Sequence, residues 1–197
     1  MSTQSYIFIG KSGCGKGTQG KLLADFLKTK DTSRDIFYVQ SGDEFRRFIQ
    51  GDSYTKHLSK KIYDDGKLEP EFLAILMWAN YFAENYNGKD HIVIDGTPRE
   101  VHEAGVLHSI FDFYKLEKPR VVYINISAEE ATRRLSGRGR RDDNEVDIKA
   151  RLKWFETDVI PTIDFYRSNP FYQFVEVNGE RDTEVVHQEI LQRVGLI

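Results

Sequence analysis

Short apolar runs alternate along the chain with longer segments whose apolar residues recur every three or four positions. The runs cover residues 6–9, 36–40, 92–94, 121–126 and 174–177. Each is nearly continuous in apolar side chains, which is typical of parallel strands that are covered on both faces. The alternation predicts an α/β fold in which helices cover both faces of a five-stranded parallel sheet, giving three layers.

Helical spacing is clear in five of the intervening segments, which are residues 16–28, 69–86, 128–137, 147–168 and 183–194. Ser127 and Glu130 form a capping-box pattern at the start of the third segment. Pro161 lies inside the fourth, so we expect a kink or a break there.

Two regions do not fit a plain alternation of strands and helices. Residues 42–86 hold about three helical segments between two strands, which suggests an inserted helical part. Residues 136–146 are glycine-rich, charged and nearly free of apolar side chains, so we expect a mobile surface loop.

Composition narrows the class of protein further. The chain has 197 residues, 40% of them hydrophobic, and its 28 Lys+Arg against 31 Asp+Glu give a formal net charge of -3. One domain is therefore expected, and a generally basic nucleic-acid-binding protein is not. The single cysteine, Cys14, excludes an intrachain disulfide framework and fits a cytoplasmic location. The amino terminus lacks a signal-peptide pattern, and no apolar run approaches the length of a membrane span.

The segment Gly10–Thr18 (GKSGCGKGT) follows an expected strand and opens an expected helix. This is the context in which G-x-x-x-x-G-K acts as a phosphate-binding loop, or P-loop. Its glycines let backbone N–H groups turn toward phosphate oxygens, and Lys16 adds a charge for the β- and γ-phosphates. Thr18 supplies a hydroxyl one position later than usual, after Gly17. Cys14 is interpreted as a small loop residue; a redox sensor is the alternative.

Five arginines occur within residues 133–141 (RRLSGRGRR). Such a concentration of one sign repels itself, and a bound polyphosphate would relieve that repulsion. A nucleic-acid patch is the alternative, and the overall acidic charge argues against it.

Several motifs, in the same order, resemble those of the adenylate kinase family of nucleoside monophosphate kinases. They are Lys16-Gly17-Thr18-Gln19, Ser41-Gly42-Asp43 with Arg46, Gly66-Lys67-Leu68, Asp95-Gly96-Thr97-Pro98-Arg99, the arginines Arg134, Arg138, Arg140 and Arg151 around Asp142-Asp143-Asn144, and Asn178-Gly179. The resemblance spans nearly the whole chain. It implies a P-loop NTPase-type core (1–40, 87–135 and 147–197), a helical part that binds the nucleoside monophosphate (NMP; 41–86) and a short lid (136–146).

The resemblance also implies a role for each matching residue in transfer of the ATP γ-phosphoryl group to a monophosphate, giving two ADP when the acceptor is AMP. The catalytic residues would be Lys16, Arg99, Arg138, Arg140 and Arg151. The ATP site would use Gly13, Cys14, Gly15, Lys16, Gly17, Thr18, Arg134, Arg138 and Gly179. The NMP site would use Ser41, Gly42, Arg46, Leu68, Gly96, Arg99, Glu103, Arg140 and Arg151.

Magnesium is the implied cofactor, bound with ATP. Asp95 and Asp43 would hold it through water, because Mg²⁺ keeps several waters and takes few protein ligands. Asp142 and Asp143 are expected to orient the lid arginines instead. The implied partners are ATP and a monophosphate, with no nucleic acid and no membrane, and we expect a monomer.

The sequence departs from the family pattern at the acceptor base. Glu103 stands where the family has glutamine, and Thr97 where it has an aromatic residue. A carboxylate only accepts hydrogen bonds, whereas adenine presents one donor and one acceptor. AMP is the favoured acceptor, and broader or pyrimidine-type (UMP/CMP) specificity is the alternative. A P-loop kinase acting on a small alcohol or nucleoside, and a catalytically inactive nucleotide-binding regulator, are further alternatives.

Overall fold

Five parallel strands form one sheet in the order β2-β3-β1-β4-β5. The computed structural model describes residues 2–116, 118–140 and 143–197. The strands are β1 (Ser5–Ile9), β2 (Ile36–Gln40), β3 (His91–Asp95), β4 (Arg120–Asn125) and β5 (Gln173–Asn178). All five expected strands are present, and their ends lie within two residues of the expected ones.

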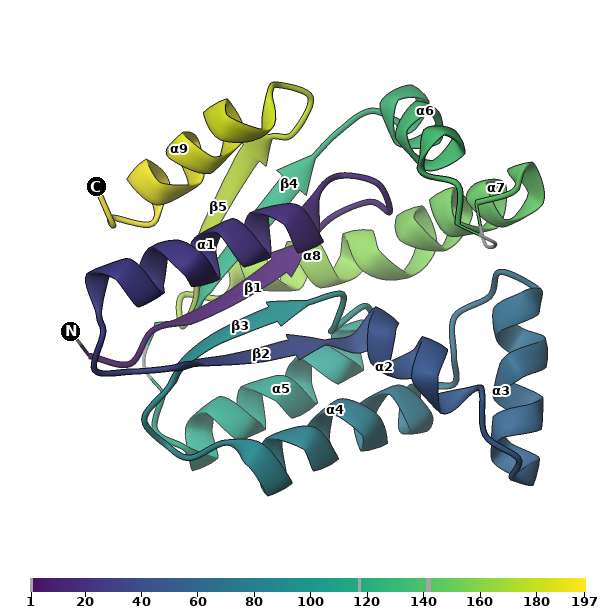
Figure 1. Cartoon of the computed structure of the whole chain (residues 1–197), viewed down its shortest axis with the longest axis horizontal. Helices are drawn as coiled ribbons and strands as arrows, with labels where there is room; N and C mark the ends of the chain where they lie inside the picture. Colours follow the sequence, from purple (N-terminus) through teal and green to yellow (C-terminus); the bar gives the residue numbers. More distant parts are fainter. Residues whose placement is uncertain (1, 117, 141–142) are drawn as a thin grey trace.

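Helices cover both faces of the sheet (Figure 1). On one face, α1 (Lys16–Lys30) and α9 (Thr183–Arg193) pack on Tyr6 and Phe8 of β1. On the other, α4 (Glu71–Asn85), α5 (Val101–Phe113) and α8 (Ile160–Ser168) pack on Ile7 and Ile9. Successive side chains of a strand point to opposite faces, so β1 supplies both cores. The predicted three-layer α/β fold with a five-stranded parallel sheet is confirmed.

The segment predicted to break at Pro161 is divided into three pieces. Helix α7 (Glu145–Trp154) continues into a π-helical turn, η1 (Phe155–Val159), and then into α8, with Pro161 in its first turn. Proline has no N–H to donate to the preceding turn, and the first turn of a helix does not require one.

The remaining helices gather at the carboxyl ends of the strands. They are α2 (Ser41–Phe48), α3 (Tyr54–Asp64) and α6 (Ala128–Arg138), together with the start of α7 (Figure 1). Helices α2, α3 and α4 are the three helical segments predicted for residues 42–86. In open parallel sheets ligands bind at the carboxyl ends of the strands, so we expect the functional site at this edge. Within the described residues, no helix combines the length and apolar character of a membrane span.

Candidate active site

The P-loop connects β1 to α1 at the carboxyl edge of the sheet. Gly10 has φ +149°, and a Cβ there would lie 2.5 Å from the carbonyl oxygen of Ile124, so no other residue fits. Gly15 is the left-handed N-cap of α1, and no side chain caps it. The unpaired N–H groups at the start of α1 therefore face the loop, where an anion would bind.

Lys16 folds back across this loop. Its Nζ donates to the carbonyl oxygens of Gly10 (2.7 Å) and Lys11 (3.0 Å). Cys14 is buried, and its Sγ lies 3.7 Å from the same Nζ. The Cys14 N–H already donates to the Lys11 carbonyl oxygen, so this residue shapes the loop from within.

Asp95 ends β3 beside the P-loop. A Cβ added at Gly17 would lie 3.2 Å from Asp95 Oδ2, so the absence of a side chain at position 17 lets the carboxyl approach α1 closely. Burial raises the pKa of Asp95, against the lowering charges of Lys16 and Arg99. A buried acceptor therefore lies next to the phosphate-binding loop.

One carboxylate joins Arg138 at the end of α6, Arg140 after it and Arg151 in α7. Arg138 donates to both oxygens of Asp143, at 2.8 and 2.6 Å, and Arg151 donates to Oδ1 at 3.2 Å. The backbone N–H of Arg140 donates to Oδ2 at 3.1 Å. The Asp143 side chain is only 2% exposed. Its burial acts to raise its pKa, but the bonds and charges of these arginines outweigh that effect and lower it. The expected role of Asp143 in orienting the arginines agrees with this geometry.

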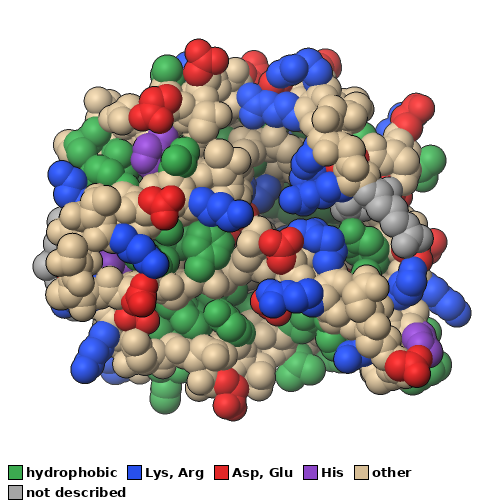
Figure 2. Space-filling model, viewed as in Figure 1, with side chains coloured by type: hydrophobic (Ala, Val, Ile, Leu, Met, Phe, Trp, Pro, Cys, Tyr) green, Lys and Arg blue, Asp and Glu red, His purple; other side chains and the backbone are tan. Residues whose placement is uncertain are grey.

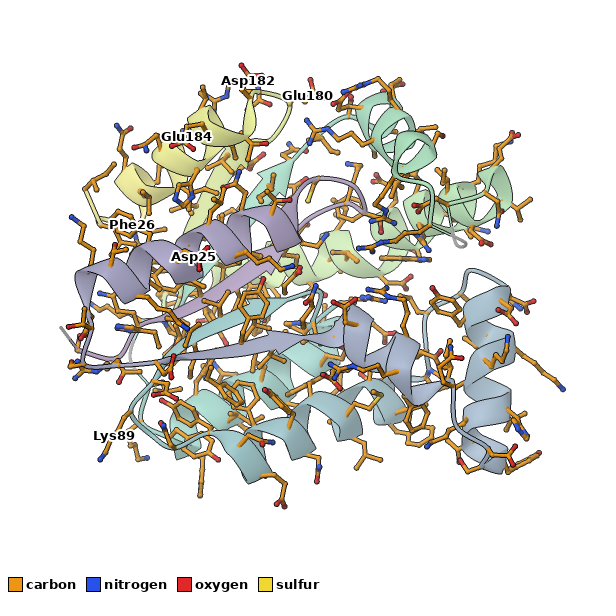
Figure 3. All side chains as sticks on the ribbon, in the orientation of Figure 1. Asp25, Phe26, Lys89, Glu180, Asp182 and Glu184 are labelled. Atoms are coloured by element: carbon orange, nitrogen blue, oxygen red, sulfur yellow. The ribbon has the colours of Figure 1, made fainter. Side chains whose placement is uncertain are left out.

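Arg134 links α6 to the loop after β5. It donates to Glu130 Oε1 (2.6 Å) and to the carbonyl oxygen of Gly179 (2.8 Å). Figure 3 shows the neighbouring Glu180 at the amino end of α9, on the same side of the sheet as α1. Gly179 has no room for a side chain, because a Cβ would lie 2.4 Å from Ile124 Cγ2. Arg134 and Gly179 are thus joined at one end of the site.

These groups surround a cleft of about 480 Å³. Lys and Arg side chains gather around the hollow seen in Figure 2. Of the residues predicted for the site, those that line the cleft are Gly13, Gly15, Lys16, Gly17, Thr18, Gly42, Arg46, Asp95, Gly96, Arg99, Arg134, Arg138, Arg140 and Arg151. The structure therefore brings the P-loop, the acceptor arginines and the lid arginines to one cavity.

A smaller pocket opens beside the cleft, beneath α2. Its lining residues are Ser41, Phe45, Leu68, Glu69, Ala74, Gly96, Thr97, Arg99 and Glu103. We call it the acceptor pocket. It has an aromatic and aliphatic side and a polar side, and its volume is about 10 Å³, so a nucleobase enters it only if the side chains around it move apart.

Glu103 lies in this pocket and is 3% exposed. Its Oε2 accepts from the Thr97 hydroxyl and from the Arg99 N–H, both at 3.1 Å. Arg99 in turn donates through Nε to the Gly96 carbonyl oxygen (2.9 Å) and stacks on Trp154 at 5.3 Å. Burial raises the pKa of Glu103, although these donors oppose the rise. One carboxyl oxygen is therefore held by the loop that carries Arg99.

Three predicted residues do not line either cavity, namely Cys14, Gly179 and Asp43. Asp43 instead accepts a hydrogen bond from Arg46 within α2. Burial acts to raise its pKa, but Arg46, Arg140 and Lys21 lower it overall. Arg141 and Asp142 lie outside the described residues. Predicted lid residues 136–138 form the last turn of α6, and 145–146 the first turn of α7.

Sequence reasoning missed several residues of the cleft, among them Lys21, Tyr63 and Trp154. Lys21 lies four residues after Gly17 and hence on the same face of α1, which is a signal that helical spacing could have supplied. Trp154 is half-buried; it packs against the apolar core and also lines the cleft.

Asp95 and Asp43 offer the oxygen ligands that Mg²⁺ prefers. Within residues 2–116, 118–140 and 143–197, no group of three or more His, Cys, Asp or Glu could hold a metal ion by itself. Two carboxylates fit a Mg²⁺ ion that arrives with a nucleotide and keeps most of its waters. They are too few to bind a metal ion without the nucleotide.

Comparison with known proteins agrees with this arrangement. The family model for adenylate kinase matches residues 8–170. An adenylate kinase of Leptospira biflexa is 33% identical over 95% of this chain and 98% of its own length. Adenylate kinase 1 of a Nostoc species and an adenylate kinase of Corynebacterium aurimucosum are each 29% identical, over 96% of this chain and 97% and 98% of their own lengths. The chain belongs to the adenylate kinase family and is a P-loop nucleoside monophosphate kinase.

Proposed function

We propose that the chain catalyses reversible transfer of the ATP γ-phosphoryl group to AMP, giving two ADP. The observation that carries this proposal is that one cleft is lined both by the P-loop and by Arg46 and Arg99, beside the smaller pocket that holds Glu103. A kinase for a small alcohol would have no need of two arginines at its acceptor side. The names of the relatives favour AMP as acceptor.

The donor phosphates are held, in this proposal, by the start of α1 and by Lys16. Lys16 bonds its own loop in the structure, so it must exchange carbonyl oxygens for phosphate oxygens when ATP binds. Arg134, fixed by Glu130 and Gly179, offers a flat cationic surface at the base end.

Transfer needs positive charge around the moving phosphoryl group more than it needs covalent chemistry. Arg138 and Arg151 are held by Asp143 with their guanidinium groups in the cleft. Among the described residues, the Arg140 guanidinium has no hydrogen-bond or ion-pair partner although its backbone is fixed, which leaves it available to the phosphate. Arg99 lies between the cleft and the acceptor pocket and would hold the acceptor phosphate with Arg46.

Mg²⁺ would neutralise charge on the ATP phosphates, with Asp95 and Asp43 holding its waters. Asp95 sits where it can accept from such a water, since its carboxyl faces the P-loop across Gly17.

Both nucleotide sites come from one chain, which supports a monomer. The lone buried cysteine is compatible with the reducing cytoplasm.

The test is an acceptor panel at equal concentrations of AMP, GMP, CMP and UMP with Mg-ATP. We expect AMP to react fastest, no reaction when the metal is chelated, and formation of ATP and AMP from ADP alone. A CMP or UMP rate well above that of AMP would overturn the adenylate assignment. Tight nucleotide binding without turnover would instead indicate a regulator.

A further inference from the structure

Lys11, the second residue of the P-loop, has a buried side chain that does not line the cleft. It is 9% exposed, which is unusual for a lysine. Its Nζ lies 4.3 Å from the centroid of the Phe155 ring and 3.7 Å from Glu156 Oε1. The Glu156 side chain is 62% exposed whereas Phe155 is fully buried, so the ring is the stronger of the two contacts. The backbone of Lys11 is fixed too, because its carbonyl oxygen accepts from Lys16 Nζ at 3.0 Å.

Phe155 is the first residue of the π-helical turn η1, which joins α7 to α8. The Ile160 N–H donates to the Phe155 carbonyl oxygen five residues earlier. The Phe155 N–H in turn donates to the carbonyl oxygens of Arg151 and Leu152. Single π-helical turns are rare and occur frequently at functional sites. Lys11 therefore contacts the residue at which α7, with its cleft arginine, passes into this turn.

The residues on either side of η1 both hold Arg99. Before the turn, the Trp154 ring lies against the Arg99 guanidinium, with 5.3 Å between Cζ and the ring centroid. After the turn, the fully buried Thr162 hydroxyl donates to the Arg99 carbonyl oxygen at 2.9 Å. Protein interiors are close-packed and transmit strain. A displacement of η1 would therefore move both supports of Arg99.

We propose that Lys11 is a positioning residue for the acceptor site: its ammonium group, held on the Phe155 ring, fixes η1 against the P-loop and thereby fixes Arg99. This inference rests on the proposed function, in which Arg99 holds the acceptor phosphate. The path runs from Lys11 to Phe155, through one peptide bond to Trp154, and from that ring to Arg99. A side chain of the donor loop thus acts on the acceptor.

The experiment measures kcat and the KM of ATP and of AMP for the wild type, Lys11→Met and Lys11→Arg. Methionine keeps an unbranched apolar chain without the charge, whereas arginine keeps a cation that stacks on aromatic rings. Lys30→Met is the matched control, because Lys30 lies 5.3 Å from the Phe26 ring centroid at the end of α1 opposite to the P-loop.

We expect Lys11→Met to raise the KM for AMP by about tenfold, and to change kcat and the KM for ATP by less than about twofold. Arg99 would hold the acceptor phosphate both before and during transfer, so its misplacement appears in KM. Lys11→Arg should restore the KM for AMP to within about threefold of the wild type. Phe155→Leu, which removes the ring, should reproduce the rise, and Lys11→Met should add little to it.

A KM for ATP that rises as much as the KM for AMP would overturn the proposal, because Lys11 would then act as a charge on the donor side. An unchanged KM for AMP in Lys11→Met would overturn it as well, and so would an equal change in Lys30→Met or additive effects of Lys11→Met and Phe155→Leu. Partial loss of folding lowers the amount of active enzyme and leaves KM intact.

Failure of the proposed function would be seen separately, in the wild type. If another monophosphate proves to be the best acceptor, its KM takes the place of that for AMP. If the wild type transfers no phosphoryl group, the Kd of AMP measured by calorimetry tests the same prediction, with the same expected rise in Lys11→Met and none in Lys30→Met.

Discussion

The two sides of the cleft differ in the groups that they offer to a phosphate. On the donor side, the contacts come from backbone groups and from one lysine, and glycines make them possible because a Cβ at Gly10 would strike a neighbouring carbonyl. On the acceptor side, they come from arginines whose positions depend on buried carboxyls, such as Arg99 on Glu103 and Arg151 on Asp143. The donor side is therefore built from one continuous segment, which Ile124 of β4 bounds, while the acceptor arginines come from separate segments and are each held by a carboxyl nearby in the chain.

The largest effect should come from the donor side. We expect Lys16→Met to lower kcat by about 10²–10³-fold, since it removes a preorganised charge from the transferring phosphoryl group. Lys28→Met, at an exposed position of the same helix, is the control and should leave kcat near that of the wild type. Steady-state kinetics of ADP formation measure both. A loss below tenfold for Lys16→Met would mean that the loop backbone alone carries the donor side.

Asp143 gives the next largest effect. Asparagine in its place keeps the shape but loses the charge that holds Arg138 and Arg151 together. Misplacement of such groups by about 1 Å can cost about 10² in rate, so we expect kcat of Asp143→Asn to fall by about that factor.

Asp164→Asn removes an exposed carboxylate that pairs with Arg167 on the far part of α8, and should change kcat little. Kinetics with saturating ATP and AMP separate the two variants. Equal kcat in both would show that the arginines do not need Asp143.

The contrast between the two sides explains what could be predicted from sequence. The P-loop was found because its glycines and lysine are adjacent in the chain and their spacing has one physical meaning. The strands were found because a strand buried on both faces leaves a continuous apolar run. By contrast, Tyr63 and Trp154 gave no such signal. Their place in the cleft results from how α3, α4 and α7 pack, and single-sequence patterns do not report packing.

The same limit applies to Glu103. Its chemistry was readable from the sequence, since a carboxylate stands where the family has an amide. That Oε2 would be held by Thr97 and by the Arg99 N–H was not, because those bonds depend on the turn between β3 and α5. The resemblance implies that this residue lies at the base, and the structure shows that its Oε2 is bonded within the loop.

Glu103→Gln tests whether this side chain reads the acceptor base. The amide oxygen should keep the bonds to Thr97 and to the Arg99 N–H, which turns the amide NH₂ toward the pocket. That group can donate to adenine, which the ionised carboxyl cannot do. We expect the preference for AMP over GMP in kcat/KM to rise by about tenfold. No change would show that Glu103 supports Arg99 without reading the base.

The same substitution has a pH signature. Burial raises the folded-state pKa of Glu103 above its ordinary value, so the carboxyl binds a proton more readily in the folded protein than in the unfolded chain. The stability that this contributes is present in full below the unfolded-state pKa and is lost as pH rises through the folded-state pKa. Arg99 opposes the shift, whereas Glu100 adds to it. Urea unfolding at pH 5 and pH 8 should show a smaller fall in stability for Glu103→Gln than for the wild type; equal falls would contradict this assignment.

Gly17→Ala should give the smallest effect and is the finest test of the donor side, because its consequences for stability and for activity have opposite signs. Alanine is about 1 kcal/mol more favourable than glycine inside a helix, so the free energy of unfolding should rise by up to about that amount. Its methyl group would lie 3.2 Å from Asp95 Oδ2, which forces the buried carboxyl to move by a few tenths of an ångström. If Asp95 positions the waters of a nucleotide-bound Mg²⁺, that displacement should lower kcat several-fold and raise the Mg²⁺ concentration needed for half-maximal rate.

Gly137→Ala, in α6 with no atom within 4 Å of the added methyl, offers the same gain in helix propensity without that contact. A stabilised Gly17→Ala enzyme with unchanged kcat and Mg²⁺ dependence would show that the close approach of Asp95 to α1 serves packing alone.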